Sequence, residues 1–376
     1  MTIAEKVQNT EASAIPRPRG SEESPAAQPF AGGRLYILDG LRLVAALMVV
    51  IWHFVGANSS EAYGEPTSSL FPAVVWKLAH YGWTGVYLFF LISGFVICMS
   101  AWGRPLGDFA ASRITRLFPA YWFAVLLTSA VLWLAPIFNG RRKPSDTVSN
   151  LSMFHELLGV RPIDPAYWTL LVEMQFYLLF ALIVAKGLTY KRVVTFCVVW
   201  TLVSLAAFAY SVPGAAALAP KFSSFFVAGI AFYLIYRFGS SLLLWGIVGF
   251  SWIICMNRLI RLSAGNYSAN WRPASVAVTL FFVLVALIAL HKFDWVRWKA
   301  LVAAGALTYP LYLVHQEIGL TLIKGFSGHI APIPLLLGVI AVVLLLAYLI
   351  HRLVEKPVAR LLKRGLASSL AQLRRG

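Results

Sequence analysis

The stretch Leu38–His53, LDGLRLVAALMVVIWH, decides the fold class of this chain of 376 residues. It is an apolar segment of helical length that nevertheless carries Asp39, Arg42 and His53. Ionisable side chains are costly inside a membrane, so each of them marks a functional-site hypothesis. Arg42 and His53 are about three helical turns, or about 16 Å, apart along a helix axis. We therefore expect both side chains on one helix face, one near a membrane surface and one deep.

The composition of the whole chain is that of a polytopic membrane protein. Hydrophobic residues make up 59% of the chain and charged residues only 12%, whereas soluble globular proteins have about 25% charged residues. Several apolar runs approach the roughly 20 residues that cross a hydrocarbon core. The formal net charge of +17 does not indicate nucleic-acid binding, because the basic residues lie in loops between apolar runs. We expect membrane lipid, and no nucleic acid, as a partner.

The three cysteines, Cys98, Cys197 and Cys255, each lie inside an apolar run. Their spacing fits neither a metal site nor a disulfide framework. We expect them to be small buried apolar residues, and we expect no metal ion.

We predict an all-α fold, a polytopic transmembrane helix bundle of about ten spans. The predicted parts are a disordered, polar, cytoplasmic tail over residues 1–33, the transmembrane domain over 34–357 and a basic cytoplasmic tail over 358–376. The spans are expected at Tyr36–Gly56, Gly82–Trp102, Leu117–Pro136, Tyr167–Lys186, Val193–Ser211, Phe222–Arg237, Ser241–Met256, Ala274–His291, Ala300–Leu320 and Ile333–Arg352.

The loops predict how this bundle is oriented in a membrane. With the N-terminus inside, most Lys and Arg side chains fall in segments that face the cytoplasm, as the positive-inside rule requires. The exception is the basic cluster Arg141–Lys143, on a long predicted outer loop. We therefore expect both termini in the cytoplasm.

This orientation divides the ionisable groups of the spans into two sets. His53, Glu173 and His315 come from three different spans and are predicted at a similar depth in the outer half. They are expected to meet in one buried pocket that is suited to acid–base chemistry. The other set gathers near the inner face.

The inner set is built from arginines. Arg113 and Arg116, in the stretch SRITRLFPAYW, are three residues apart and hence neighbours on a helix. Arg42 is predicted at the same end of the bundle. Guanidinium groups bind phosphates with two parallel hydrogen bonds, so this end is predicted to bind a phosphorylated ligand.

The motif LDGLRLVAALMVVIWH is followed, in order, by GVYLFFLISGF, SRITRLFPAYW, WTLLVEMQFY, LTYPLYLVH and VEKP. In these stretches the chain resembles acyltransferase family 3, membrane-bound enzymes that O-acylate bacterial surface polysaccharides and related glycans. The resemblance extends from about residue 36 to residue 357. Leu43 stands where the family commonly has Gly, and Thr308 stands where it usually has Ser. Neither departure removes a candidate reacting group.

The resemblance implies a bundle of about ten helices in the bacterial inner membrane. It implies an acyl-CoA, most often acetyl-CoA, as the donor substrate, and no permanently bound cofactor. The implied acceptor is a hydroxyl of a carbohydrate or lipid-linked glycan, such as O-antigen or exopolysaccharide. The Arg-to-His motif of the family falls on Arg42 and His53, and its paired-arginine motif falls on Arg113 and Arg116.

The mechanistic hypothesis assigns a role to each ionisable group. Arg42, Arg113 and Arg116 would bind the phosphates of acyl-CoA. His53 would act as the general base, since imidazole titrates near neutral pH. Glu173 would orient His53, as a carboxylate does in a catalytic triad.

Four further residues are candidates for the pocket. Tyr177 and Tyr309 have hydroxyl groups of the kind that stabilise an oxyanion. Trp168 could line a sugar-binding surface. His315 could belong to the site or be a core histidine.

Two other classes of protein stay open at this stage. Intramembrane His, Glu and Arg residues also mark the substrate pathways of transporters, although the chain shows no internal repeat of the kind that many transporters have. The chain could also be a non-catalytic component of a polysaccharide export or assembly system.

Overall fold

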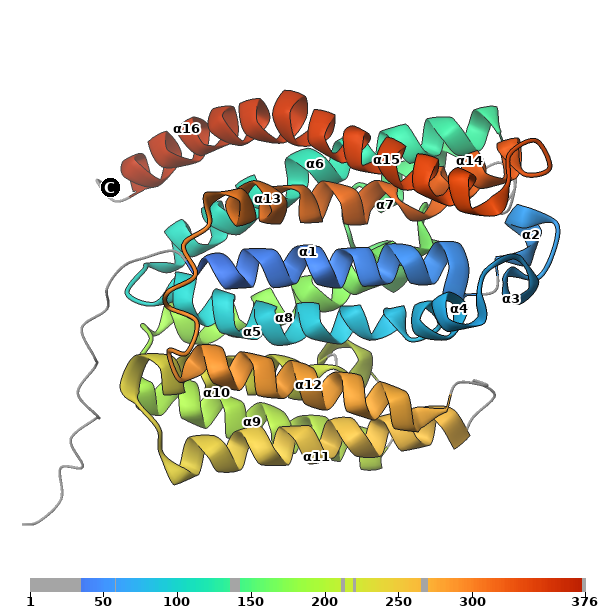
Figure 1. The fold of residues 1–376 in the computed structure, drawn as a ribbon. Coiled ribbons are helices and arrows are strands. Elements are labelled where there is room, and N and C mark those ends of the chain that lie inside the picture. Colours follow the sequence, from blue (N-terminus) through green and yellow to red (C-terminus); the bar gives the residue numbers. More distant parts are fainter. Residues whose placement is uncertain are drawn as a thin grey trace, which may run out of the picture.

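The computed structural model describes residues 35–57, 59–135, 143–210, 214–218, 221–264 and 270–373. Within these ranges the chain forms a bundle of α-helices and no β-strand (Figure 1). The tail that was predicted over residues 1–33 lies outside the described residues.

Ten apolar helices of the described chain form the bundle. Eight are long and apolar enough to cross a membrane, and two, α10 and α13, are shorter. Each predicted span coincides with one of them, and the prediction of an all-α polytopic bundle is confirmed. They are α1 (Tyr36–Ile51), α5 (Gly85–Ala101), α6 (Leu106–Leu134), α8 (Trp168–Ala185), α9 (Tyr190–Ala209), α10 (Ser223–Phe238), α11 (Leu242–Ala264), α12 (Trp271–Ala289), α13 (Lys299–Val314) and α15 (Pro332–Ile350).

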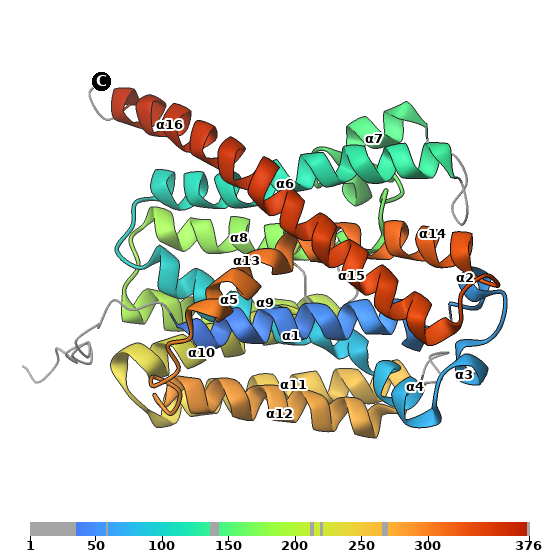
Figure 2. The ribbon, with the colours of Figure 1, turned by 45° about the horizontal axis from the view of Figure 1, so that its top comes forward.

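The bundle has two distinct ends, which we name after residues of α1. The Tyr36 end is at the left of Figure 1, and the His53 end is at the right. Short helices gather at the His53 end (Figures 1 and 2). They are α2 (Ser60–Tyr63), α3 (Thr67–Leu70), α4 (Ala73–Ala79), α7 (Pro144–Asn150) and α14 (Gln316–Phe326).

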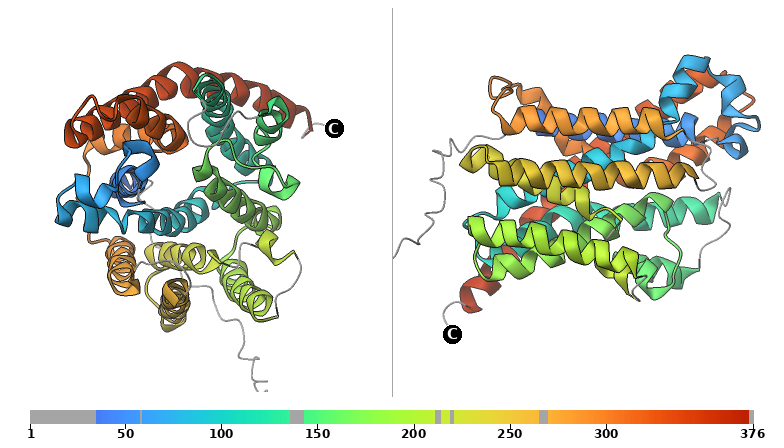
Figure 3. Two further views of the ribbon diagram at one scale, coloured as in Figure 1. Left: turned by 90° about the vertical axis from the view of Figure 1, so that its right-hand side faces the viewer. Right: turned by 90° about the horizontal axis from the view of Figure 1, so that it is seen from below.

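Helix α10 is buried on all sides. Every residue from Ser223 to Ile235 is buried, and α10 contacts α5, α9, α11 and α12. The end-on view in Figure 3 shows these helices grouped in one part of the bundle. A helix that is apolar all round needs such a buried position.

The contact between α5 and α10 depends on two glycines. A Cβ atom at Gly94 would lie 2.2 Å from the carbonyl oxygen of Phe226, and one at Gly229 would lie 2.1 Å from that of Leu91. The two helices therefore touch backbone to backbone. Small residues at such crossings allow the close packing that associates helices in membranes.

Several helix boundaries differ from the predicted ones, and the three largest differences are at α6, at α11 and in the C-terminal tail. Helix α6 begins at Leu106 and not at Leu117, so both arginines of SRITRLFPAYW lie inside the helix. Helix α11 extends to Ala264. A helix that leaves the apolar layer can continue with polar residues, so hydropathy alone locates only its apolar part.

The third difference concerns the predicted basic tail after residue 357. Residues Lys356–Leu373 form helix α16, which continues α15 through a π turn at His351–Glu355. Helix α16 packs against α6, and Figure 2 shows α16 crossing over α6 obliquely. Most of this tail is therefore an ordered part of the bundle.

We expect Gly94→Ala to lower the thermal stability of the detergent-solubilised protein, because the added methyl group would overlap the Phe226 carbonyl. Overpacking costs about 1–3 kcal/mol, which corresponds to a few degrees in the melting temperature. The matched control is Gly246→Ala in α11, where an added Cβ has nothing within 4 Å. Equal melting temperatures for the two variants would contradict the backbone contact.

Candidate functional site

His53 lies in a π turn, Trp52–Gly56, that continues α1 at the His53 end. The segment that follows the turn binds its carbonyl groups. The Ser59 hydroxyl donates to the His53 carbonyl at 2.5 Å, and the Thr67 hydroxyl donates to the Val55 carbonyl at 2.8 Å. Single π turns occur frequently at functional sites. The turn is thus a stabilised feature that fixes where the His53 ring lies.

The His53 ring is hydrogen-bonded to His315. Nδ1 of His53 lies 2.9 Å from Nε2 of His315, and Nδ1 of His315 lies 2.8 Å from the Tyr312 carbonyl oxygen. A carbonyl oxygen only accepts, so Nδ1 of His315 carries the proton, and its Nε2 accepts from Nδ1–H of His53. In the neutral pair, His53 therefore keeps its lone pair on Nε2. This is the tautomer that a general base needs.

The position of His315 is set by an interruption between α13 and α14. An unbroken helix would join the Leu313 carbonyl to the Glu317 amide. Instead, the Tyr167 hydroxyl donates to the Leu313 carbonyl at 3.0 Å, and the Glu317 amide donates to the Asp164 carboxylate at 3.1 Å. Side chains that enter the backbone ladder are a known cause of helix breaks. His315 sits at the centre of this break.

The segment Asp164–Tyr167, which provides these side chains, is itself held by hydrogen bonds. Asp164 is fully buried and also accepts from the Ala166 amide at 2.8 Å. The Tyr312 hydroxyl, one turn before His315, donates to the Ala166 carbonyl at 3.1 Å. The start of α8 and the two sides of the break at His315 therefore form one hydrogen-bonded unit.

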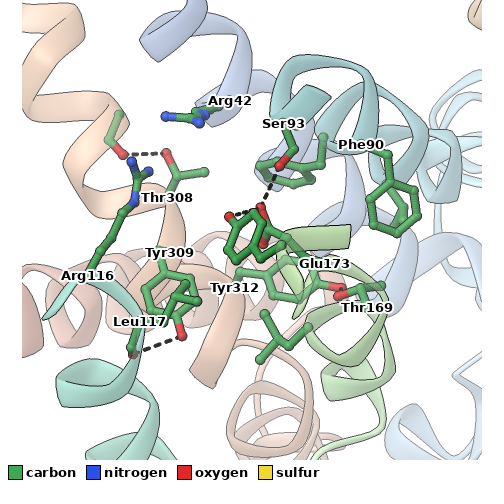
Figure 4. A pocket seen from close by; sticks show the side chains of 15 residues that line it. Arg42, Phe90, Ser93, Arg116, Leu117, Thr169, Glu173, Thr308, Tyr309 and Tyr312 are labelled. Atoms are coloured by element: carbon green, nitrogen blue, oxygen red, sulfur yellow. Dashed lines mark hydrogen bonds between the residues drawn. The ribbon is translucent and has the colours of Figure 1, made fainter. Parts of the chain in front are cut away.

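A cavity of about 90 Å³ lies between α1, α5, α6, α8 and α13 (Figure 4). Its wall includes the Tyr312 ring, so the cavity ends close to the His315 pair. His53 itself is not among the residues that line it. Its polar lining includes Arg42, Ser93, Arg116, Glu173, Tyr177 and Thr308.

Glu173 is held by two hydroxyl groups of this cavity. Ser93 donates to Oε1 at 2.7 Å, and Tyr177 donates to the same atom at 2.5 Å. Arg42 is near enough to Glu173 and to the buried Asp39 for electrostatic attraction. Figure 4 shows the guanidinium groups of Arg42 and Arg116 near one another, with Glu173 across the cavity.

The predicted meeting of Glu173 with His53 is wrong. The segment Asp164–Tyr167 does not end at the membrane surface but reaches into the bundle to the level of His315. Helix α8 therefore starts deep, and six residues after Tyr167 it places Glu173 about 9 Å further toward the Tyr36 end. Glu173 joins the arginine set, and His315 takes the place beside His53.

The three arginines divide between two positions. Arg42 and Arg116 line the cavity, whereas Arg113 does not. Arg113 is buried, and its guanidinium lies over the rings of Phe109 and Tyr177, at 5.8 and 5.9 Å from their centroids. Arg113 thus packs against the ring of Tyr177 and not into the cavity.

The remaining sequence candidates have internal partners. The Tyr309 hydroxyl lines the cavity and donates to the Leu117 carbonyl at 3.0 Å, while that of Tyr177 is used by Glu173. Both predicted oxyanion donors are therefore engaged in this state. Trp168 lies outside the cavity lining and packs on Phe222, with ring centroids 5.2 Å apart.

Residues 35–352 match the family described as the acyltransferase domain. The chain belongs to acyltransferase family 3. A multi-pass membrane acyltransferase follows from this membership and from the apolar helices. The site described above lies within the matched residues.

Two curated relatives of the family are similar to the chain. Acyltransferase MdmB of Streptomyces mycarofaciens is 26% identical over 374 residues, which cover 88% of this chain and 93% of MdmB. The peptidoglycan O-acetyltransferase YrhL of Bacillus subtilis (strain 168) is 28% identical over 173 residues, or 40% of this chain. The match spans only about a quarter of YrhL, 24% of its length. No solved structure matches the chain.

Sequence reasoning missed the residues that hold this candidate site together. The predicted span begins at Tyr167, Asp164 falls in the predicted loop before it, and Ser93 is not predicted to lie beside Glu173. An available signal was the pattern Asp-Pro before an apolar run, which is typical of a capped helix start. Nothing in one sequence shows that the cap also binds a second helix.

We expect Asp164→Asn to lower the melting temperature of the protein. The amide nitrogen cannot accept one of the two backbone hydrogen bonds that the Asp164 side chain receives from Ala166 and Glu317, and this loss costs about 1–3 kcal/mol. Asp146→Asn, in the short helix α7, is the control and should keep the wild-type melting temperature. An unchanged melting temperature in Asp164→Asn would contradict this role of Asp164.

Proposed function

We propose that the protein is an integral-membrane O-acyltransferase that moves an acyl group, most commonly acetyl, from cytoplasmic acyl-CoA to a carbohydrate hydroxyl. The observation that carries this proposal is the bonded pair of His53 and His315. Its hydrogen-bond chain leaves the lone pair of His53 on Nε2. A buried histidine with this tautomer is suited to accept a proton from an alcohol.

The proposed chemistry is a direct transfer. Nε2 of His53 takes the proton of the acceptor hydroxyl while the acceptor oxygen attacks the thioester carbonyl carbon. The tetrahedral intermediate then breaks its carbon–sulfur bond. The proton on His53 passes to the departing sulfur, so the products are the O-acyl ester and free CoA thiol. His315 keeps the His53 ring oriented and stabilises its charged form.

The donor is proposed to enter from the Tyr36 end. Arg42 and Arg116 line the cavity and would bind phosphates of acyl-CoA, since guanidinium groups bind phosphate in a bidentate manner. The separation of about 16 Å between Arg42 and His53 along α1 is comparable with the length of a pantetheine arm. The arm would pass the Tyr312 ring, which forms the cavity wall nearest to His315.

Glu173 takes a different role from the one expected from sequence. It faces Arg42 and Arg116 across the donor cavity and accepts from Ser93 and Tyr177. We assign it to this cavity, where its charge balances the arginines before the donor binds. It is thus a donor-site residue and not the orienting group of His53.

The acceptor is proposed to be a glycan that reaches the His53 end from outside the cytoplasmic membrane of a bacterium, with both termini of the chain inside. The name of YrhL refers to peptidoglycan O-acetylation, which makes a carbohydrate hydroxyl the acceptor class to test first. O-antigen, exopolysaccharide and lipid-linked glycans are the specific candidates. A transporter or a non-catalytic export component is the competing function.

We expect His53→Ala to abolish acylation while the protein remains folded and abundant. The test expresses wild type and variant in the native host lacking its own gene, and records proton NMR spectra of the purified surface glycans. The O-acetyl resonance should be present with the wild type and absent with His53→Ala and with the deletion. General-base removal costs about 10²- to 10⁴-fold in rate.

The matched control is His329→Ala, an exposed histidine at the same end of the bundle. It should retain the wild-type resonance. A normal resonance in His53→Ala would remove the general base from the proposal. Glycans that do not change when the gene is deleted would contradict a surface-polysaccharide acceptor.

We expect His315→Gln to keep more activity than His315→Leu. The Gln side-chain oxygen can accept from Nδ1–H of His53 and preserve its tautomer, whereas Leu leaves that donor unpaired. The release of free CoA thiol by the purified protein measures the rate. We expect about a tenfold difference between the variants, equivalent to one hydrogen bond of about 1.4 kcal/mol. Equal rates would show that His315 does not orient His53.

A further inference from the structure

A second cavity lies between α9, α10 and α11, away from the candidate site. Its volume is about 510 Å³, which is within the usual range of ligand pockets. The cavity is at the His53 end of the bundle, where α5 begins. Phe222, at the start of α10, packs near Tyr87 in the first turn of α5. Three cationic side chains line it: Lys221, Arg258 and Arg261.

These cations have no acidic residue on the helices that form the cavity. The sequence contains no Asp or Glu between Glu173 and Asp294, a stretch that includes α9, α10, α11 and α12. Arg258 lies over the Phe222 ring at 4.7 Å from its centroid and interacts with the Tyr87 hydroxyl. Cationic groups at membrane depth are costly unless they are paired.

Two buried polar atoms of the cavity lining lack partners in the described part of the chain. They are Nε of Arg258 and the hydroxyl oxygen of Ser204. Ser204 is only 5% exposed and lines the cavity from α9. A buried polar atom without a hydrogen bond costs about 1–3 kcal/mol, and a bound polar group would remove this cost.

The rest of the lining is apolar and reaches the outer surface of the bundle. Phe208, Phe250 and Ile253 line the cavity and are 58%, 48% and 49% exposed. In a membrane protein, such side chains face lipid. The cavity therefore combines a cationic, polar part with an apolar part that opens toward the bilayer.

We propose that this cavity binds a membrane amphiphile with an anionic phosphate head group. The phosphate would lie among Lys221, Arg258 and Arg261, since guanidinium and ammonium groups both bind phosphate. The hydroxyl of Ser204 would donate to the head group. The apolar chain would leave along Phe208 and Phe250. This inference does not depend on the acyl-transfer reaction.

The occupant would lie close to the candidate site. Phe222, which supports Arg258, packs on Phe90 with ring centroids 5.1 Å apart. Phe90 in turn lines the cavity that contains Arg42 and Glu173. Two packed aromatic rings, Phe222 and Phe90, thus connect Arg258 with the cavity that contains Arg42 and Glu173.

The test is native mass spectrometry of the whole detergent-purified protein with added lipid. Phosphatidylglycerol and zwitterionic phosphatidylcholine of the same acyl chains are compared, and inorganic phosphate is the third probe. We expect one molecule of phosphatidylglycerol per protein, bound at least tenfold more tightly than phosphatidylcholine. Inorganic phosphate alone should bind at least tenfold more weakly than phosphatidylglycerol.

The variants test the site in two independent ways. The double variant Arg258→Ala, Arg261→Ala removes the charges, and Ser204→Phe fills the cavity without changing charge. Each should weaken phosphatidylglycerol binding at least tenfold. The control Arg272→Ala removes a cation of α12 that lies over Trp271 and outside the cavity lining, so it should have no effect.

Three results would overturn the proposal. Equal binding of the two lipids would show that the cations do not select an anion. Unchanged binding in Ser204→Phe, which keeps every charge, would place the lipid elsewhere. Tight binding of inorganic phosphate, with displacement of phosphatidylglycerol, would show an ion site that does not need the apolar chain.

Discussion

The structure of the site depends on one exchange of hydrogen bonds. The helix that begins at Lys299 lacks the hydrogen bond between the Leu313 carbonyl and the Glu317 amide. The Tyr167 hydroxyl donates to that carbonyl instead, and the Asp164 side chain accepts from that amide. Both exchanged backbone groups, the Leu313 carbonyl and the Glu317 amide, thus stay hydrogen-bonded in a place where an unsatisfied backbone group would be expensive. These hydrogen bonds fix the position of His315 within an apolar span. His315 in turn determines the tautomer of His53.

The same exchange divides the core into two chemical regions. Because the segment before α8 is anchored at His315, the helix starts deep and brings Glu173 opposite Arg42. Charged groups therefore gather in a cavity nearer the Tyr36 end, while the two histidines lie beyond Tyr312. The proposed acyl-CoA donor, if it enters from the Tyr36 end, would meet the arginines with its phosphates first and the histidines with its thioester.

Periodicity and hydropathy predict the spans well, because a membrane imposes one strong requirement on every apolar segment. They also predict that Arg42 lies in the first helix and His53 about three turns further along it, although His53 is found in the π turn that continues α1. They do not reveal the π turn at Trp52, since its stabilising partners, Ser59 and Thr67, lie in a separate segment. The depth of Glu173 could not be predicted either. It depends on how far Tyr167 enters the bundle, and this is set by a tertiary contact, the hydrogen bond from Tyr167 to Leu313. The family membership identifies the chemistry but not this geometry.

The histidine pair joins residues that are 262 positions apart in the chain, and the clamp on Leu313 joins residues 146 apart. Ribosomes add about 5–20 residues per second, so His53 enters the bilayer tens of seconds before its partner is made. The histidine pair is then completed only when the penultimate span has been inserted. Incomplete chains would contain Arg42 and Arg116 but would lack the residue that orients His53, so, if His53 is the proposed general base, biogenesis itself delays activity until nearly the whole bundle is assembled.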